Sequence, residues 1–174
     1  MSKLNKQIRW ICLVALFLAI TVVLSSFGIP VPGGHLYLCD ISICLASMFL
    51  DPLGAFIVGG IGSFLGDFFF YPAPMFVSLV VHGLQAIVIS LFSNYVLKKK
   101  PVTASVIGNI IGGIIMVVGY SLGRAFIYST PEYALLKLPF QFLQAGIGIV
   151  VALIVGWKGH LVIVGRKFLN PDKY

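Results

Sequence analysis

Acidic and imidazole side chains are concentrated in an otherwise apolar stretch, residues 33–85. This stretch holds three of the five acidic residues and two of the three histidines, namely Asp40, Asp51, Asp67, His35 and His82. Ionisable groups are costly in lipid, so they usually face a protein interior or a water-filled cavity. Their chemistry suits hydrogen bonding to a small polar molecule. The stretch is therefore predicted to line a small-molecule site inside a membrane protein.

Amide, phenol and guanidinium groups farther along the chain could complete this site. His82 and Gln85 are three residues apart, and Gln141 and Gln144 repeat the spacing, which places each pair on one helical face. Aromatic side chains could stack on a ligand ring. The candidate substrate-binding residues are His35, Tyr37, Asp40, Asp67, Tyr71, His82, Gln85, Tyr120, Arg124, Gln141 and Gln144. Such polar residues can also join helices by hydrogen bonds, and this alternative stays open.

The composition is that of a protein embedded in lipid. Of 174 residues, 59% are hydrophobic and only 10% are charged, whereas a soluble domain has about 25% charged residues. A soluble core of this length could not bury so much apolar surface. We therefore expect one integral membrane domain over residues 1–174. Nucleic-acid binding is not expected, because membrane topology explains the net charge of +7.

The chain is predicted to be an all-α membrane protein with six transmembrane helices and cytoplasmic termini. About 20 apolar residues cross the hydrocarbon core as a helix, and prolines mark the breaks. The expected helices cover residues 8–27, 38–50, 52–70, 75–97, 102–128 and 138–157. The expected connections are an apolar loop Gly28–Leu38, a basic turn Lys98–Lys100, a loop Ser129–Lys137 and a basic tail Lys158–Tyr174.

Charge distribution supports counting the short segment 38–50 as a span. With six spans, ten of the twelve lysines and arginines lie on the side of the termini, and only Arg124 and Lys137 lie on the other side. This division satisfies the positive-inside rule. The candidate site residues then all fall in the outer half of the membrane, which predicts a site that opens outward.

Several enzymatic functions are disfavoured by motifs that the sequence lacks. It has no GxxxxGK[ST] loop for ATP, no HExxH pair and no nucleophile elbow. The residues before Asp67 lack the GxGD signature of intramembrane aspartyl proteases, so a dyad with Asp40 is not expected. The three cysteines have no metal-ligand spacing. We expect no catalytic residue, no cofactor and no metal.

Two runs of sequence resemble the S components of energy-coupling factor (ECF) vitamin transporters. Ala15-Leu-Phe-Leu-Ala19 is similar to the AxxxA contact motif of that family, and HLYLCDISICLASMFLDPLGAFIVGGIGSFLGDF carries the rest of the resemblance, which covers roughly residues 8–160. It implies a subunit that captures a small-molecule vitamin or precursor from outside, most similar to the hydroxymethylpyrimidine or pyridoxine type. It also implies docking through Ala15 and Ala19 on a transmembrane coupling protein with two cytoplasmic ATP-binding subunits. The implied location is the cell membrane of a Gram-positive bacterium.

Two other functions remain open. The first is a self-sufficient secondary carrier coupled to protons through Asp67 and His82, and the second is a membrane scaffold or enzyme. For the capture subunit, the expected ligand is a small neutral or weakly basic heteroaromatic molecule. This expectation depends on a site with one arginine, with Lys137 assigned to a loop. The loop Gly28–Leu38 is predicted to close over the ligand as a lid.

Overall fold

Helices make up most of the molecule, and the computed structural model describes residues 3–96 and 99–173. Five-residue π-helical turns (η1–η4) interrupt or extend four of the long helical segments. The elements in chain order are α1 (Lys3–Ser26), β1 (Ile29–Val31), β2 (Gly34–Leu36), α2 (Cys39–Ser47), α3 (Pro52–Phe56), η1 (Ile57–Ile61), α4 (Gly62–Phe70), α5 (Met75–Leu91), η2 (Phe92–Val96), α6 (Pro101–Gly123), η3 (Arg124–Tyr128), α7 (Pro131–Leu153), η4 (Ile154–Lys158), α8 (Leu161–Leu169) and the 3-10 turn η5 (Pro171–Lys173).

Prolines begin three of these helices. Pro52, Pro101 and Pro131 each occupy the first turn, where the missing N–H costs nothing and the fixed φ suits a helix. The expected start at residue 52 is confirmed, and the start expected at 102 differs by one residue. The expectation of a loop over Ser129–Lys137 is wrong, because α7 begins at Pro131 and includes Lys137. Leu97 and Lys98, which end one expected helix and begin the basic turn, lie outside the described residues.

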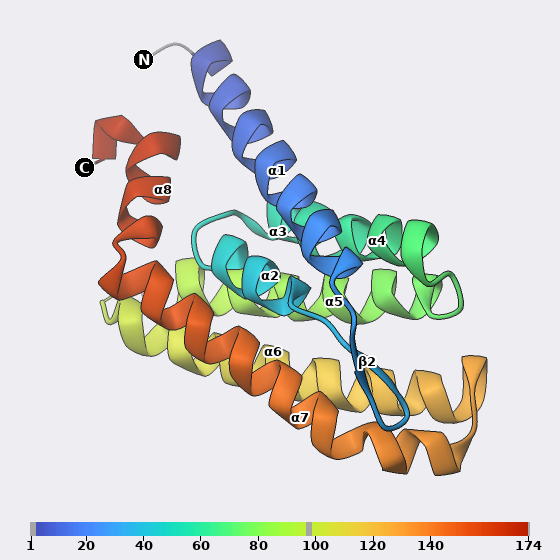
Figure 1. Cartoon of the computed structure of the whole chain (residues 1–174). Helices are drawn as coiled ribbons and strands as arrows, with labels where there is room; N and C mark the ends of the chain where they lie inside the picture. The colour runs from blue at the N-terminus through green and yellow to red at the C-terminus, as the bar shows by residue number, and fades with distance from the viewer. Residues whose placement is uncertain (1–2, 97–98, 174) are drawn as a thin grey trace.

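Residues 29–36 form an antiparallel hairpin instead of an irregular loop. β1 and β2 pair from Ile29 with Leu36 to Val31 with Gly34. Gly33 and Gly34 have φ values of 79° and 142°, a backbone region that residues with a Cβ rarely adopt. The hairpin extends from the end of α1 toward α7 (Figure 1).

Successive helical segments alternate in direction along the chain, provided that the short α2 is counted as one of them. Gly54 packs against Trp10 and Val14, while Gly66 packs against Ser25, so α1 and the segment α3–α4 run in the same direction. Residues 39–51 must therefore return the chain between them. At the end of that return, Trp10 Nε1 donates a hydrogen bond of 2.5 Å to Asp51 Oδ1.

Five helical segments in the described residues are long and apolar enough to cross a membrane: Leu4–Ser26, Pro52–Phe70, Met75–Val96, Pro101–Tyr128 and Pro131–Lys158. The expected span 38–50 contains only nine helical residues, about 14 Å at 1.5 Å per residue. It occupies the centre of the molecule, where all its side chains except Ile41 are buried. The C-terminal part of α2 packs with Val14, Val58 and Ile89 in the main apolar core. The count of six spans stays a prediction.

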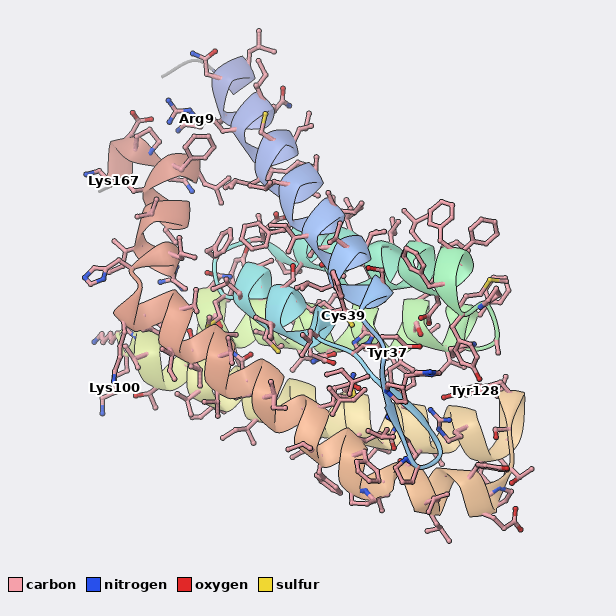
Figure 2. All side chains as sticks on the ribbon, in the orientation of Figure 1. Arg9, Tyr37, Cys39, Lys100, Tyr128 and Lys167 are labelled. Atoms are coloured by element: carbon pink, nitrogen blue, oxygen red, sulfur yellow. The ribbon has the colours of Figure 1, made fainter. Side chains whose placement is uncertain are left out.

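Both termini lie at one end of the bundle (Figure 1). The expected basic tail forms α8, because Val162 and Leu169 are apolar and buried against the core. Arg9 Nη1 donates to Phe168 O at 3.1 Å and ties α8 to α1. Figure 2 shows Arg9, Lys100 and Lys167 at this end of the molecule.

Candidate functional site

A buried hydrogen-bond network is centred on Asp40 in the first turn of α2. Gln85 Nε2 of α5 donates to Oδ1 at 3.0 Å, and Gln144 Nε2 of α7 donates to Oδ2 at 2.6 Å. His82 Nδ1 is hydrogen-bonded to Gln85 Oε1 at 2.7 Å. A carboxylate in an apolar interior needs such donors, and hydrogen bonds to a charged acceptor are the strong ones. Asp40 therefore joins three helices at one point.

The network reaches the hairpin segment through Gln144. Its side-chain Oε1 accepts the backbone N–H of Tyr37 at 3.1 Å. Figure 2 shows Tyr37 and Cys39 near the end of α1, where the chain enters α2. The glutamine thus fixes the end of the hairpin and the start of α2 to α7.

A cavity of about 40 Å³ lies between the hairpin and α4, α5, α6 and α7. Nine of the eleven candidate residues line it: His35, Tyr37, Asp67, Tyr71, His82, Tyr120, Arg124, Gln141 and Gln144. Asp40 and Gln85 are outside the lining and act behind it through His82 and Gln144. Ligand contact by these residues stays a prediction.

A second polar group forms one wall of the cavity. Ser78 Oγ of α5 donates to Asp67 Oδ2 of α4 and is 2.5 Å from the hydroxyl of Tyr120 on α6. A serine has one hydroxyl hydrogen, so the tyrosine donates to the serine. The Tyr120 ring meets the His82 ring edge-on, with centroids 5.1 Å apart. Ser78 was not among the predicted site residues, although it lies one helical turn before His82.

Two basic side chains, one from η3 and one from α7, hold the hairpin. Arg124 Nη1 donates to Gly33 O at 2.7 Å, and Lys137 Nζ donates to His35 O at 2.5 Å. Lys137 is only 2% exposed and lines the cavity, which corrects its assignment to an outer loop. The sequence spacing could have revealed the burial of Lys137, because it lies one helical turn from Ala134 and one from Gln141, and both of these residues are buried.

Three buried polar atoms of the lining residues have no hydrogen-bond partner within the described part of the chain. They are Ser63 Oγ, Arg124 Nε and Tyr128 Oη. Leaving such a group unsatisfied costs about 1–3 kcal/mol. Burial, reinforced by the charge of Asp67, raises the pKa of Tyr37 to about 12, so its hydroxyl stays protonated. The cavity thus presents several donors to a bound molecule.

The cavity as closed is too small for a vitamin. It could hold a few water molecules, whereas ligand sites usually measure about 300–1,000 Å³. The hairpin, Tyr37 and the turn with Tyr71 and Pro74 are the parts of the lining that lie outside the helices. Ligand entry therefore requires one of these connecting segments to move.

Cys39, Asp40 and His82 place atoms of metal-ligand type within 4.8 Å of one another. They come from two helices, so sequence spacing could not reveal the group. Both carboxylate oxygens of Asp40 already accept glutamine amides. These two amides offset the charge of Asp40 without a metal.

The two alanines of α1 lie away from the cavity. Ala15 and Ala19 are exposed, and the neighbouring Leu16 and Ile20 are exposed as well. They do not form an internal packing seam. This face of α1 is available to lipid or to another protein.

Comparison with known proteins identifies the family to which this chain belongs. Residues 5–158 match the family described as "ECF-type riboflavin transporter, S component". The chain belongs to this family. The S component is accordingly a multi-pass membrane protein and a transporter subunit, and its family is not one of enzymes.

Relatives of this S component occur in distant organisms. A Pyrococcus woesei protein described as "uncharacterized protein in gap 3'region" is 30% identical over 155 residues, which cover 88% of this chain and 98% of the relative. The UPF0397 protein YdcD of Lactococcus lactis is 28% identical, with 80% of this chain and 78% of that protein covered.

Proposed function

We propose that this S component captures a small water-soluble vitamin or precursor on the outer side of the membrane, with hydroxymethylpyrimidine or pyridoxine as the ligand. The observation that carries the proposal is the small cavity beneath the hairpin, lined by polar and aromatic groups from several helices. A capture subunit needs such a compartment, because a ligand must be enclosed before it can be carried inward.

The size of the cavity favours a ligand with one aromatic ring. At about 40 Å³, it must expand for any vitamin, and a single ring demands the smaller displacement of the connecting segments. His35, Tyr37 and Tyr71 form an aromatic group beside it, with ring centroids 6.2–6.3 Å apart, which suits packing against a flat ring. Riboflavin, which the family description names, is the second candidate ligand.

The proposed topology has six spans and cytoplasmic termini. The alternating helix directions support it, and so does the clustering of basic residues such as Arg9, Lys100 and Lys167 at the end that carries the termini. We place the protein in the cell membrane, and the Lactococcus relatives favour a Gram-positive bacterium.

Delivery of the ligand is proposed to require a transmembrane coupling protein and two cytoplasmic ATP-binding subunits. The exposed Ala15 and Ala19 on α1 would form the docking face, since small side chains let a partner helix approach closely. The alternative is a proton-coupled carrier that uses Asp67 and His82. Purified protein in liposomes separates the two: uptake driven by a proton gradient alone would exclude the partner-dependent mechanism.

Calorimetry on the purified subunit tests the capture function. Hydroxymethylpyrimidine, pyridoxine and riboflavin would be titrated separately, and we expect tight binding of one of the first two. Binding of riboflavin alone would retain the capture function and change the ligand. No binding of any of the three would contradict the proposal.

A further inference from the structure

Two basic side chains converge on one end of the cavity. Arg124 begins η3 and Lys137 lies in α7, two antiparallel segments joined by the short turn at residues 129–130. Arg124 bonds to Gly33 O in the turn of the hairpin and Lys137 to His35 O in β2, so both cations reach the same hairpin. Both also line the cavity.

Neither cation forms an ion pair within the part of the chain that the structure describes. No carboxylate in residues 3–96 or 99–173 lies within 4.0 Å of either nitrogen group. Asp67 is hydrogen-bonded to Ser78 at another wall. Lys137 is buried and Arg124 is half-buried. A buried charge without a counter-charge is costly, and backbone carbonyls offset this cost only in part.

Donors remain on this wall after the hairpin bonds are counted. A lysine has three N–H donors and an arginine has five, and each makes one bond to the hairpin. Arg124 Nε is buried without a partner, and so is Tyr128 Oη four residues later. The wall thus combines positive charge with unused donors.

We infer that the ligand presents an oxyanion to Arg124 and Lys137, beneath the turn of the hairpin. A phenolate, a carboxylate or a phosphate would supply the missing negative charge and accept the free N–H and O–H groups. Asp67 on another wall would accept a donor from the same ligand. The inference rests on the proposed capture function, and it replaces the expectation of a neutral ligand, which assumed that Lys137 lies in a loop. Of the two proposed ligands it favours pyridoxine, because hydroxymethylpyrimidine has no oxygen that ionises near neutral pH.

Three related probes test the inference by calorimetry. Pyridoxine carries a hydroxyl group on its ring that loses its proton below neutral pH. In 3-O-methylpyridoxine this group is methylated and cannot ionise, whereas pyridoxine 5'-phosphate adds a phosphate. At pH 7.5 we expect pyridoxine or its phosphate to bind at least about tenfold more tightly than the methyl ether. Comparison of the first with the third identifies the kind of oxyanion.

Variants assign the preference to the two cations. In Arg124→Gln and Lys137→Gln, the affinity ratio between the charged probe and the methyl ether should fall toward one, whereas Lys137→Arg should retain it. A looser hairpin would weaken the affinity for both probes alike, so the ratio of the two affinities within one variant is not affected by it. Lys99→Gln, at the other end of the bundle, is the matched control.

Three outcomes overturn the inference. A methyl ether that binds as tightly as both charged probes would refute it alone and leave the capture function standing. An unchanged ratio in both glutamine variants would do the same. Failure of all three probes, together with hydroxymethylpyrimidine and riboflavin, would refute the capture function and this inference together.

Discussion

Individual polar residues of this S component have separable roles, although they belong to one network. Gln144 lines the cavity and bonds to the backbone of Tyr37 and to Asp40, whereas Gln85 lies behind the lining and reaches it only through His82. Both are buried. Their spacing in the sequence gave no reason to treat them differently.

Substitution of each glutamine should expose this difference. Gln144→Ala and Gln85→Ala each leave Asp40 short of one donor, so both should lower the free energy of unfolding by about 1–3 kcal/mol. Only Gln144→Ala should also weaken ligand affinity strongly, by roughly 5- to 150-fold. Thermal unfolding and calorimetry on the two variants measure the two effects. Equal loss of affinity would show that the network, not the lining, determines binding.

At the scale of elements, close contact between α2 and α7 positions Asp40. A Cβ at Gly148 would lie 2.6 Å from the Asp40 Cβ, whereas a Cβ at Gly146 would meet nothing within 4 Å. The two glycines occupy the same helix two residues apart, which provides an internal comparison.

Gly148→Ala should force α2 away from α7 and destabilise the protein by about 1–3 kcal/mol, the usual cost of overpacking. Gly146→Ala should leave stability unchanged or raise it by up to about 1 kcal/mol, because alanine favours a helix. Thermal unfolding in detergent compares them. Tolerance of Gly148→Ala would mean that the helices can separate without consequence.

A second prediction for a single element concerns the exposed face of α1, which carries Ala15 and Ala19. Ala15→Trp combined with Ala19→Trp should abolish assembly with the coupling protein and uptake, yet leave ligand binding intact, because both alanines are exposed and distant from the cavity. Ile114→Trp is the control, since Ile114 is an exposed residue of α6. Co-purification and calorimetry are the measurements. Parallel loss of assembly and binding would assign these alanines to the fold.

For the whole molecule, sidedness is the property to test. In a background without Cys12, which is exposed, single cysteines would replace Thr103 and Ser129, both exposed at opposite ends of α6 and its extension. An impermeant reagent added to intact cells should label position 129 and spare position 103. Labelling of position 103 would overturn the proposed topology.

Sequence patterns predicted the long helices well because prolines and apolar length are local signals. They also selected residues that line one cavity, since polar groups are rare in lipid and nine of the eleven candidates lie around it. Lys137 was misplaced because its partner is a carbonyl 102 residues away. The hairpin was missed because its strands are three residues long, too short for alternation to be seen. Such long-range and short-element features leave no local pattern.

The centre of the bundle also has consequences for how the protein is synthesised. Asp40 leaves the ribosome 45 residues before Gln85 and 104 residues before Gln144. The helix α2 is too short to span a bilayer by itself, and until both glutamines are made its carboxylate lacks their hydrogen bonds. The nascent chain must therefore keep α2 in a polar or sheltered environment until α7 is inserted. A chain truncated before Gln144 should remain an assembly intermediate that insertion or quality-control machinery retains.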